Sequence, residues 1–355
     1  MGIAAAVAAI AGPGCGNNTT TNPPKPPPQI THTIYYTRSF NSAGRLNGLQ
    51  DNDVFAFLVT GGNVWIGNQG GIAIYKGMKQ TVRSNAFDQN NGMPNPKVRA
   101  MVELNGSIYV GTWGGGIGVY DIGAGTWTTL NTTDGLVNDE VAQIKVHNGT
   151  LFIATNDGVS MYTPASQTWQ KFDASDSLSV PLVSALDVAT TPRGEERFYT
   201  PRIEYGIDPR DLPKLGATLQ RGSTVIWYTT LNSGLNDLNI NDVMYNADDD
   251  TYLLGTTVSG IAVVSVANST WSYITTKNGL PSNQVYSITR VGTTLWVATQ
   301  DGIARQKSDG SWQGYNRGGG LKEDRVRVVY SDNGVRLWLG YISGGAGRVD
   351  PASAQ

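Results

Sequence analysis

Residues 278–315 read NGLPSNQVYSITRVGTTLWVATQDGIARQKSDGSWQGY and are the clearest copy of a phrase that recurs along the chain. The phrase opens with Gly-Leu, reaches a Val a few residues later, and then alternates short apolar or aromatic runs with Gly-containing turns. Four runs within it are typical of short β-strands: Val285 to Arg290, Leu295 to Thr299, Ile303 to Gln306 and Trp312 to Tyr315. The turns between them supply Asp and Gly residues that tolerate the positive φ angles of tight hairpins.

Further copies of the phrase begin at Gly48-Leu49, Gly92-Met93, Gly135-Leu136, Gly234-Leu235 and Gly320-Leu321. Their spacings are 44 (48 to 92), 43 (92 to 135), 45 (234 to 279) and 41 residues (279 to 320). The gap of 99 residues from 135 to 234 holds one ordinary copy and one enlarged copy, which starts near Leu178 and carries an insertion at about 193–224. Because a period in the low forties with four strands is typical of propeller blades, we predict an all-β, seven-bladed β-propeller over residues 30–350.

The last copy supplies only three strands before the chain stops. Just upstream of the first copy, the stretch TIYYTRSF (33–40) occupies the position of a fourth strand. We therefore predict that Ile34, Tyr35, Tyr36 and Phe40 belong to a strand (about 34–40) that completes the last blade and removes an open sheet edge. The same strand could instead pair with the last blade of a neighbouring copy.

Tryptophan residues recur at the fourth strand of the repeat. They are Trp127, Trp169, Trp271 and Trp312, with Trp227 in the corresponding strand of the enlarged copy. Because the position repeats in most blades whereas a ligand site is singular, we interpret these side chains as core residues that each bury about 200 Å².

The repeat resembles the two-component regulator propeller repeats, which combine a GLP-type opening, a Val, and LW[IV]GT before a Gly-rich turn. Matching stretches are VWIGNQGGI (64–72), IYVGTWGGGI (108–117), LFIATNDGV (151–159) and LWVATQDGI (295–303). The resemblance implies a stand-alone propeller without a kinase, related to the extracytoplasmic sensor halves of hybrid histidine kinases and to secreted proteins. It is specific for the fold and says little about the ligand.

The composition and the N-terminus indicate a location outside the cytoplasm, either extracellular or at the cell surface. The 355 residues carry a net charge of −2, only 15% of them are charged, and the sequence shows no basic footprint for nucleic acid. Residues 1–15 are an apolar signal-like or assembly tail, too short for a transmembrane span. Cys15, the only cysteine, could carry a lipid, although no basic residue precedes the apolar run. An Asn/Thr/Pro-rich linker follows at 16–29, and 351–355 form a short tail.

No cluster of residues in the sequence predicts catalysis, a metal site or a cofactor site. The residues immediately before an inner-strand Val are expected to line the central channel: Asp53, Lys97, Glu140, Leu182, Asp242, Gln284 and Arg325. Both charge signs occur among them, and no neighbouring pair suits acid/base or metal chemistry. The two histidines, His32 and His147, fall in different parts of the repeat.

The segment 193–214, RGEERFYTPRIEYGIDPRDLPK, breaks the repeat and carries ten charged residues, five of each sign. It is either a tolerated surface loop or a partner-docking element, and the candidate contact residues are Arg197, Tyr199, Arg202, Tyr205 and Arg210. Candidate N-glycosylation acceptors are Asn105, Asn131, Asn148 and Asn268.

These observations favour a non-catalytic structural or interaction module that self-associates, into polymers or fibres, through its N-terminal arm. A sensor-type propeller that binds a glycan or a peptide is the alternative, and a propeller lyase or hydrolase is a third.

Overall fold

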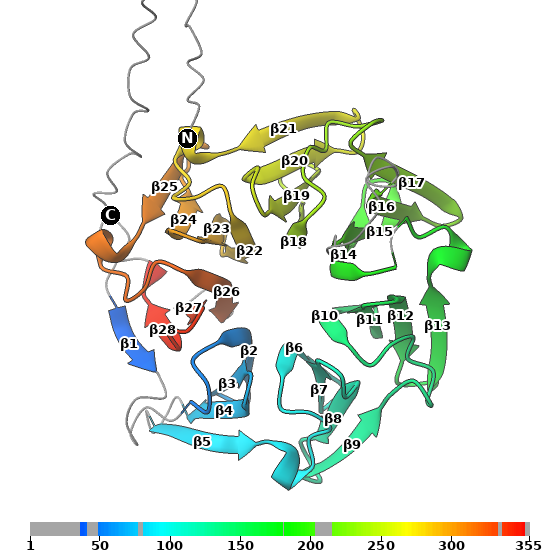
Figure 1. The fold of residues 1–355 in the computed structure, drawn as a ribbon, viewed down its shortest axis with the longest axis vertical. Coiled ribbons are helices and arrows are strands. Elements are labelled where there is room, and N and C mark those ends of the chain that lie inside the picture. Colours follow the sequence, from blue (N-terminus) through cyan, green and yellow to red (C-terminus); the bar gives the residue numbers. More distant parts are fainter. Residues whose placement is uncertain are drawn as a thin grey trace, which may run out of the picture.

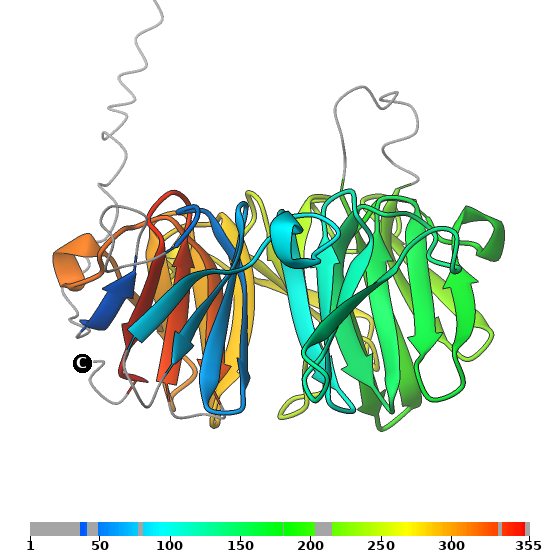
Figure 2. The ribbon, with the colours of Figure 1, turned by 90° about the horizontal axis from the view of Figure 1, so that it is seen from below.

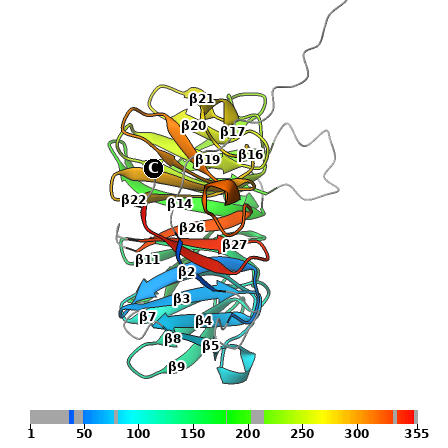
Figure 3. The ribbon, with the colours of Figure 1, turned by 90° about the vertical axis from the view of Figure 1, so that its left-hand side faces the viewer.

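The computed structural model describes residues 36–40, 49–76, 81–179, 181–202, 215–332 and 336–351. In this part of the chain, seven four-stranded antiparallel sheets stand as blades around a central channel (Figure 1). Seen from the side, the ring is a disc whose strands run across its thickness (Figures 2 and 3). The prediction of a seven-bladed all-β propeller is confirmed.

Each blade contributes one strand to each of four concentric layers. The innermost strands are β2 (Val54–Thr60), β6 (Val98–Leu104), β10 (Val141–His147), β14 (Val183–Thr191), β18 (Ile240–Asn246), β22 (Val285–Val291) and β26 (Val326–Asp332). The second strands are β3 (Asn63–Asn68), β7 (Ser107–Thr112), β11 (Thr150–Thr155), β15 (Gly194–Pro201), β19 (Thr251–Thr256), β23 (Thr294–Thr299) and β27 (Arg336–Tyr341).

The third strands are β4 (Gly71–Lys76), β8 (Ile117–Asp121), β12 (Gly158–Thr163), β16 (Gly216–Arg221), β20 (Ile261–Ser265), β24 (Gly302–Gln306) and β28 (Ala346–Val349). The outermost strands are β5 (Thr81–Phe87), β9 (Thr126–Leu130), β13 (Thr168–Phe172), β17 (Thr224–Thr229), β21 (Thr270–Ile274), β25 (Trp312–Tyr315) and β1 (Tyr36–Phe40). Short 3₁₀ turns at Gln89–Asn91, Ala174–Asp176, Thr276–Asn278 and Arg317–Gly319 lead from an outermost strand to the next blade.

The seventh blade is closed by the N-terminal strand. β1 pairs antiparallel with β28, so that Tyr36 lies opposite Val349 and Phe40 opposite Ala346 (Figure 1). The predicted ring closure is therefore confirmed for residues 36–40, whereas Ile34 and Tyr35 lie outside the described residues. Pairing the two ends of the chain gives the last blade its fourth strand.

The recurring Gly-Leu phrase has a structural cause on each of its two residues. Its apolar residue is buried in every blade, as Leu49, Met93, Leu136, Leu178, Leu235, Leu280 and Leu321. In four blades its glycine lies against the Trp of the outermost strand, at Gly92, Gly135, Gly234 and Gly279: Gly135 has φ 122°, and a Cβ there would lie 2.7 Å from Cγ of Trp169. Only glycine accommodates both this backbone conformation and the ring above it.

The tryptophan layer is only partly a buried core. Trp312 is 7% exposed, and Trp127, Trp169 and Trp271 are partly buried against interblade clusters. Trp227 is 47% exposed, so the prediction that it is a core residue is wrong. Its Nε1 instead donates to the Ser177 carbonyl over 2.8 Å at the rim of the fourth blade.

Most of the predicted insertion belongs to the fourth blade. β15 and β16 form between residues 194 and 221, and β14 pairs with β15 from Val183↔Pro201 to Thr191↔Gly194. Within 193–224, residues 203–214 lie outside the described residues, together with the candidate contacts Tyr205 and Arg210. The segment 1–35, including Cys15, also lies outside them, and no helix in the described part of the chain has the length and apolarity of a membrane span.

Candidate functional site

Every innermost strand begins with a β-bulge. The pairing with the second strand shifts register between the first and third residues, for example between Val98 and Ala100, and the same shift occurs in the other six blades. A bulge re-aims the extra side chain out of the sheet. The second residue of each strand consequently lines the mouth of the channel: Phe55, Arg99, Ala142, Ser184, Asn241, Tyr286 and Arg327.

Because of this bulge, most of the residues that the sequence predicts to line the channel do not line it. Of the seven residues expected to line the channel, only Leu182 and Asp242 line the cavity. Asp242 does so because Ile240, not Val243, takes the position of the first Val in β18. Asp53 lies at the face of the disc instead, where its Oδ1 accepts a hydrogen bond from the Ser343 amide over 2.6 Å.

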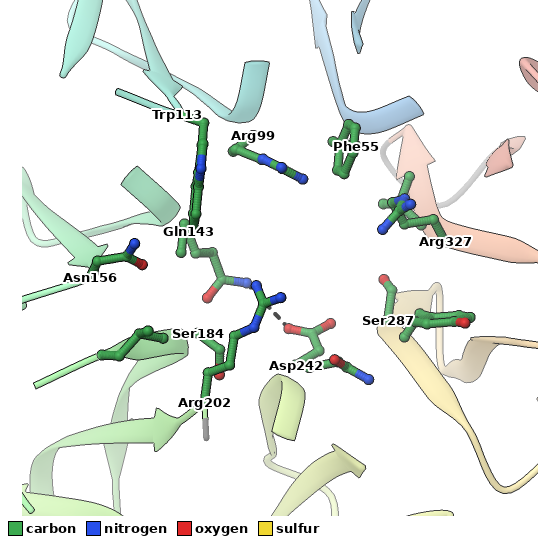
Figure 4. A pocket seen from close by; sticks show the side chains of 15 residues that line it. Phe55, Arg99, Trp113, Gln143, Asn156, Ser184, Arg202, Asp242, Ser287 and Arg327 are labelled. Carbon is green, nitrogen blue, oxygen red and sulfur yellow. Dashed lines mark hydrogen bonds between the residues drawn. The ribbon is translucent and has the colours of Figure 1, made fainter. Parts of the chain in front are cut away.

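A cavity of about 220 Å³ occupies this mouth (Figure 4). Trp113 and Asn156 border it from the turns between the second and third strands of blades two and three, and Arg202 does so from the residue after β15. The inner strands therefore start at the cavity face and run to their turns on the opposite face. Figure 4 shows Arg99, Arg202 and Arg327 converging on the cavity from three different blades.

On the other side of the cavity, polar side chains form hydrogen bonds to other blades. Gln143 Oε1 accepts from the Leu186 amide over 2.7 Å, and its Nε2 donates to Asp242 over 3.3 Å. Asp242 also accepts from the Ile288 amide over 2.8 Å, while Asn241 donates to the Val285 carbonyl over 2.8 Å. These side chains bond to the backbone of the next inner strand and thus stabilise the ring itself.

On one side of the cavity, which we call its cationic half, the side chains of Arg99 and Arg327 both lie over the ring of Phe55. The guanidinium carbons of Arg99 and Arg327 lie 4.0 and 4.3 Å from the centroid of Phe55, and that of Arg99 also lies 5.0 Å from the Trp113 ring. The buried Nε atoms of both arginines have no hydrogen-bond partner among the described residues. Ring stacking therefore positions these two cations.

The described residues compensate the positive charge of this half of the cavity poorly. Burial, together with the nearby Arg327 and Arg202, lowers the pKa of Arg99 to about 10. Burial likewise lowers the pKa of Arg327, against the opposing effect of Asp53. Both shifts mean that the folded protein disfavours the charged form, although both groups stay protonated at neutral pH.

Deeper in the channel, groups of opposite charge lie close together. Lys145 on β10 lies near Asp187 and Asp242, and these two carboxylates raise the pKa of Lys145 although burial opposes them. Burial raises the pKa of both carboxyls, and Lys145 opposes that shift. Asp187 also accepts from the Tyr245 amide over 2.7 Å. Lys145 therefore has two carboxyl groups beside it, unlike the arginines at the mouth.

The remaining predicted site residues are scattered over the disc. His147 lies on the face opposite the cavity, where its Nε2 is 3.4 Å from the Thr190 hydroxyl and 3.6 Å from Glu195. Asn105 and Asn148 are exposed at equivalent inner hairpin turns with φ 53° and 48°, also on that opposite face. Asn268 is exposed, and Asn131 is half-buried and accepts from Thr133. No group of three His, Cys, Asp or Glu suited to a metal occurs within the described ranges.

The three candidate partner residues that the structure describes, Arg197, Tyr199 and Arg202, are not gathered on one surface. Tyr199 is 1% exposed and stacks on Phe172, so the prediction that it contacts a partner is wrong. Arg197 pairs with Glu195 and covers the Phe152 ring. Arg202 alone points to the cavity (Figure 4). The sequence did not identify Arg99, Arg327 or Phe55, because the bulge that aims them is visible only in the strand register.

Comparison with known proteins gives the fold but no family. No family model and no curated protein matches the chain. Among solved structures, the extracellular domain of the hybrid two-component system BT3049 from B. thetaiotaomicron has a TM-score of 0.68 and 14% identity, covering 85% of this chain and 40% of that chain. The extracellular domain of the one-component system BT4673 from the same organism has a TM-score of 0.66 and 16% identity, covering 90% and 39%.

A third similar structure is PorZ, a surface component of the type-IX secretion system of Porphyromonas gingivalis, with a TM-score of 0.64, 16% identity and coverage of 87% and 48%. This chain shares its fold with these extracellular and surface propellers. It spans less than half the length of each of them.

Proposed function

We propose that this propeller is a non-catalytic binding module, extracellular or at the cell surface, that holds a ligand in the cavity at the mouth of its channel. One observation carries the proposal. Buried polar atoms are normally hydrogen-bonded, yet Arg99 Nε, Arg327 Nε and Asn156 Oδ1 are buried without a partner among the described residues, and all three residues line this cavity. The buried atoms themselves are out of a ligand's reach, but the side chains of Arg99 and Arg327 are only partly buried. A ligand in the cavity can therefore accept hydrogen bonds from the exposed ends of guanidinium groups that the described residues leave unpaired.

The location and the absence of catalysis rest on supporting arguments. The similar solved structures are extracellular domains of sensor systems and a surface component of a secretion system. The low charged fraction of the sequence suits a surface β-protein. The polar residues in the cavity, such as Gln143 and Asp242, are committed to interblade hydrogen bonds rather than aimed at a reacting group.

Filling the cavity tests this function. Ala142 lines the cavity, whereas Ala124 is exposed in a turn on the outer part of blade two. A thermal-shift screen of sugars, amino acids and organic acids should find compounds that stabilise the wild type and Ala124→Phe but not Ala142→Phe. NMR should recover those compounds unchanged after incubation. A screen without hits, hits that Ala142→Phe retains, or turnover of the ligand would contradict the proposal.

Self-association through the N-terminal arm is a second candidate, favoured by the pairing of β1. This five-residue strand is the outermost strand of its blade, and among the described strands it pairs with β28 alone. The β28 strand of a second copy would offer it the same pairing, which is the condition for strand exchange. Light scattering should then detect polymers of the full chain and monomers after deletion of residues 1–40, which removes β1; two monomeric samples would refute this candidate.

A further inference from the structure

The stacked arginines leave their hydrogen-bonding edges available. Phe55 lies between Arg99 and Arg327, and Trp113 lies close to the guanidinium of Arg99. An aromatic ring covers the face of a guanidinium, whose N–H donors all lie in its plane. The planar fork of donors matches the two oxygens of a carboxylate, which it binds with paired hydrogen bonds.

Among the described residues, no carboxylate is hydrogen-bonded to Arg99 or Arg327. Asp53 acts on both arginines only at a distance, and its Oδ1 is bound to the Ser343 amide over 2.6 Å. Asp242, the carboxylate that lines the cavity, accepts from the Ile288 amide and from Gln143. An anionic ligand would supply a counter-charge that none of the described residues provides at this position.

We infer that the ligand presents a carboxylate to Arg99 and Arg327, with Arg202 adding a third cation. This inference rests on the proposed function. The cavity measures about 220 Å³. Since an engineered protein cavity of about 150 Å³ holds benzene, this one has room for a single substituted six-membered ring. The ligand is thus a compact carboxylate, either a free small acid or one acidic unit of a longer molecule that projects from the open mouth.

Three probes separate charge, shape and size: glucuronate, its neutral isostere glucuronamide, and inorganic phosphate. Calorimetry on the full chain should detect glucuronate binding, with glucuronamide at least about tenfold weaker because the charge-assisted pair is lost. Arg99→Gln and Arg327→Gln should each weaken glucuronate at least about tenfold. The matched control is Arg290→Gln, whose guanidinium pairs with Asp248 on the opposite face. A linear trigalacturonate distinguishes the two sources, since tighter binding than galacturonate assigns the site to an acidic unit of a chain.

Several results would overturn the inference. Equal binding of glucuronate and glucuronamide, or full affinity in both arginine variants, would show that the arginines do not recognise a carboxylate. Either result would leave the proposed binding function intact. Phosphate that binds as tightly as glucuronate would remove the preference for a planar anion. If no probe binds and both arginine variants melt at lower temperature than Arg290→Gln, the arginines are structural.

Discussion

Glu196 offers the sharpest test of how the fourth and fifth blades are joined. Its side chain is 0% exposed, and its Oε1 accepts from Arg193 over 2.9 Å and from Arg221 Nε over 2.8 Å. Arg193 also donates to Asp250 of the next blade over 2.9 Å, and the Tyr252 hydroxyl lies 3.3 Å from Glu196 Oε2. Replacing Glu196 by Gln removes the one fully buried anion between two arginines and keeps the side-chain volume.

The expected loss is large for a single substitution. Breaking a buried, hydrogen-bonded ion pair costs about 3–5 kcal/mol, which for a domain of this size lowers Tm by roughly 5–8 °C. The matched control is Asp248→Asn: this carboxylate is 69% exposed and pairs with Arg290 over 2.7 Å, so its loss should cost less than about 1 kcal/mol. Differential scanning calorimetry at pH 7 measures both. Equal Tm values for the two variants would refute the reasoning.

The difference in Tm between the wild type and Glu196→Gln should also depend on pH. Burial disfavours the charged carboxylate, but the bonds from Arg193 and Arg221 prevail and hold the pKa of Glu196 below its usual range. A lowered folded-state pKa contributes stability above the unfolded value of about 4.3, which is lost as the pH falls below it. The Tm gap between wild type and Glu196→Gln should therefore narrow on acidification below about pH 4, and a widening gap would contradict this assignment.

Two further predictions concern packing and alkaline stability. Gly135→Ala should destabilise the fold by roughly 2–5 kcal/mol, from the strain of a positive φ and from overpacking, because the new Cβ would lie 2.7 Å from Trp169. The control is Gly149→Ala, where φ is 76° and nothing lies within 4 Å of the new Cβ. Equal decreases in Tm for the two variants would contradict the Gly–Trp contact. Burial raises the pKa of Tyr315 to about 12, so the unfolded chain loses this proton first and stability should fall by up to about 1.4 kcal/mol per pH unit between pH 10 and 12 for this group. Denaturant titrations should show a shallower fall for Tyr315→Phe, and an identical slope would argue against the raised pKa.

The sequence predicted the blades well because the features that define a blade repeat. The apolar residue of the opening is buried in every blade, and in four blades the Trp that follows lies against the glycine before it. The closing strand could be predicted because the last copy lacks a fourth strand and residues 36–40 precede the first copy in that register. Repetition, rather than propensity in any one segment, made the prediction reliable.

The site was not predicted, because it depends on register rather than on pattern. A bulge at the start of each inner strand turns the residue after the first apolar position into the channel, and nothing in the residue types of Phe55 or Arg99 marks that shift. The charges of 193–214 suggested a surface loop or a partner-docking element, yet Glu196 and Arg193 form an ion pair beside Asp250 of the fifth blade. Only the pairing of β14 with β15 reveals that this segment is part of a blade.

The first strand of the chain closes the ring, so that all seven bulges surround one cavity. A disulfide cross-link between β1 and β28 tests this closure directly. Ser39 lies opposite Gly347 in the pairing of β1 with β28, within reach of a disulfide. With Cys15 replaced by Ser, the pair Ser39→Cys and Gly347→Cys should oxidise to a disulfide-linked monomer, whereas Ser39→Cys with Ser331→Cys on β26 should not. Cross-linking only between molecules, or none at all, would contradict the closed seven-bladed ring.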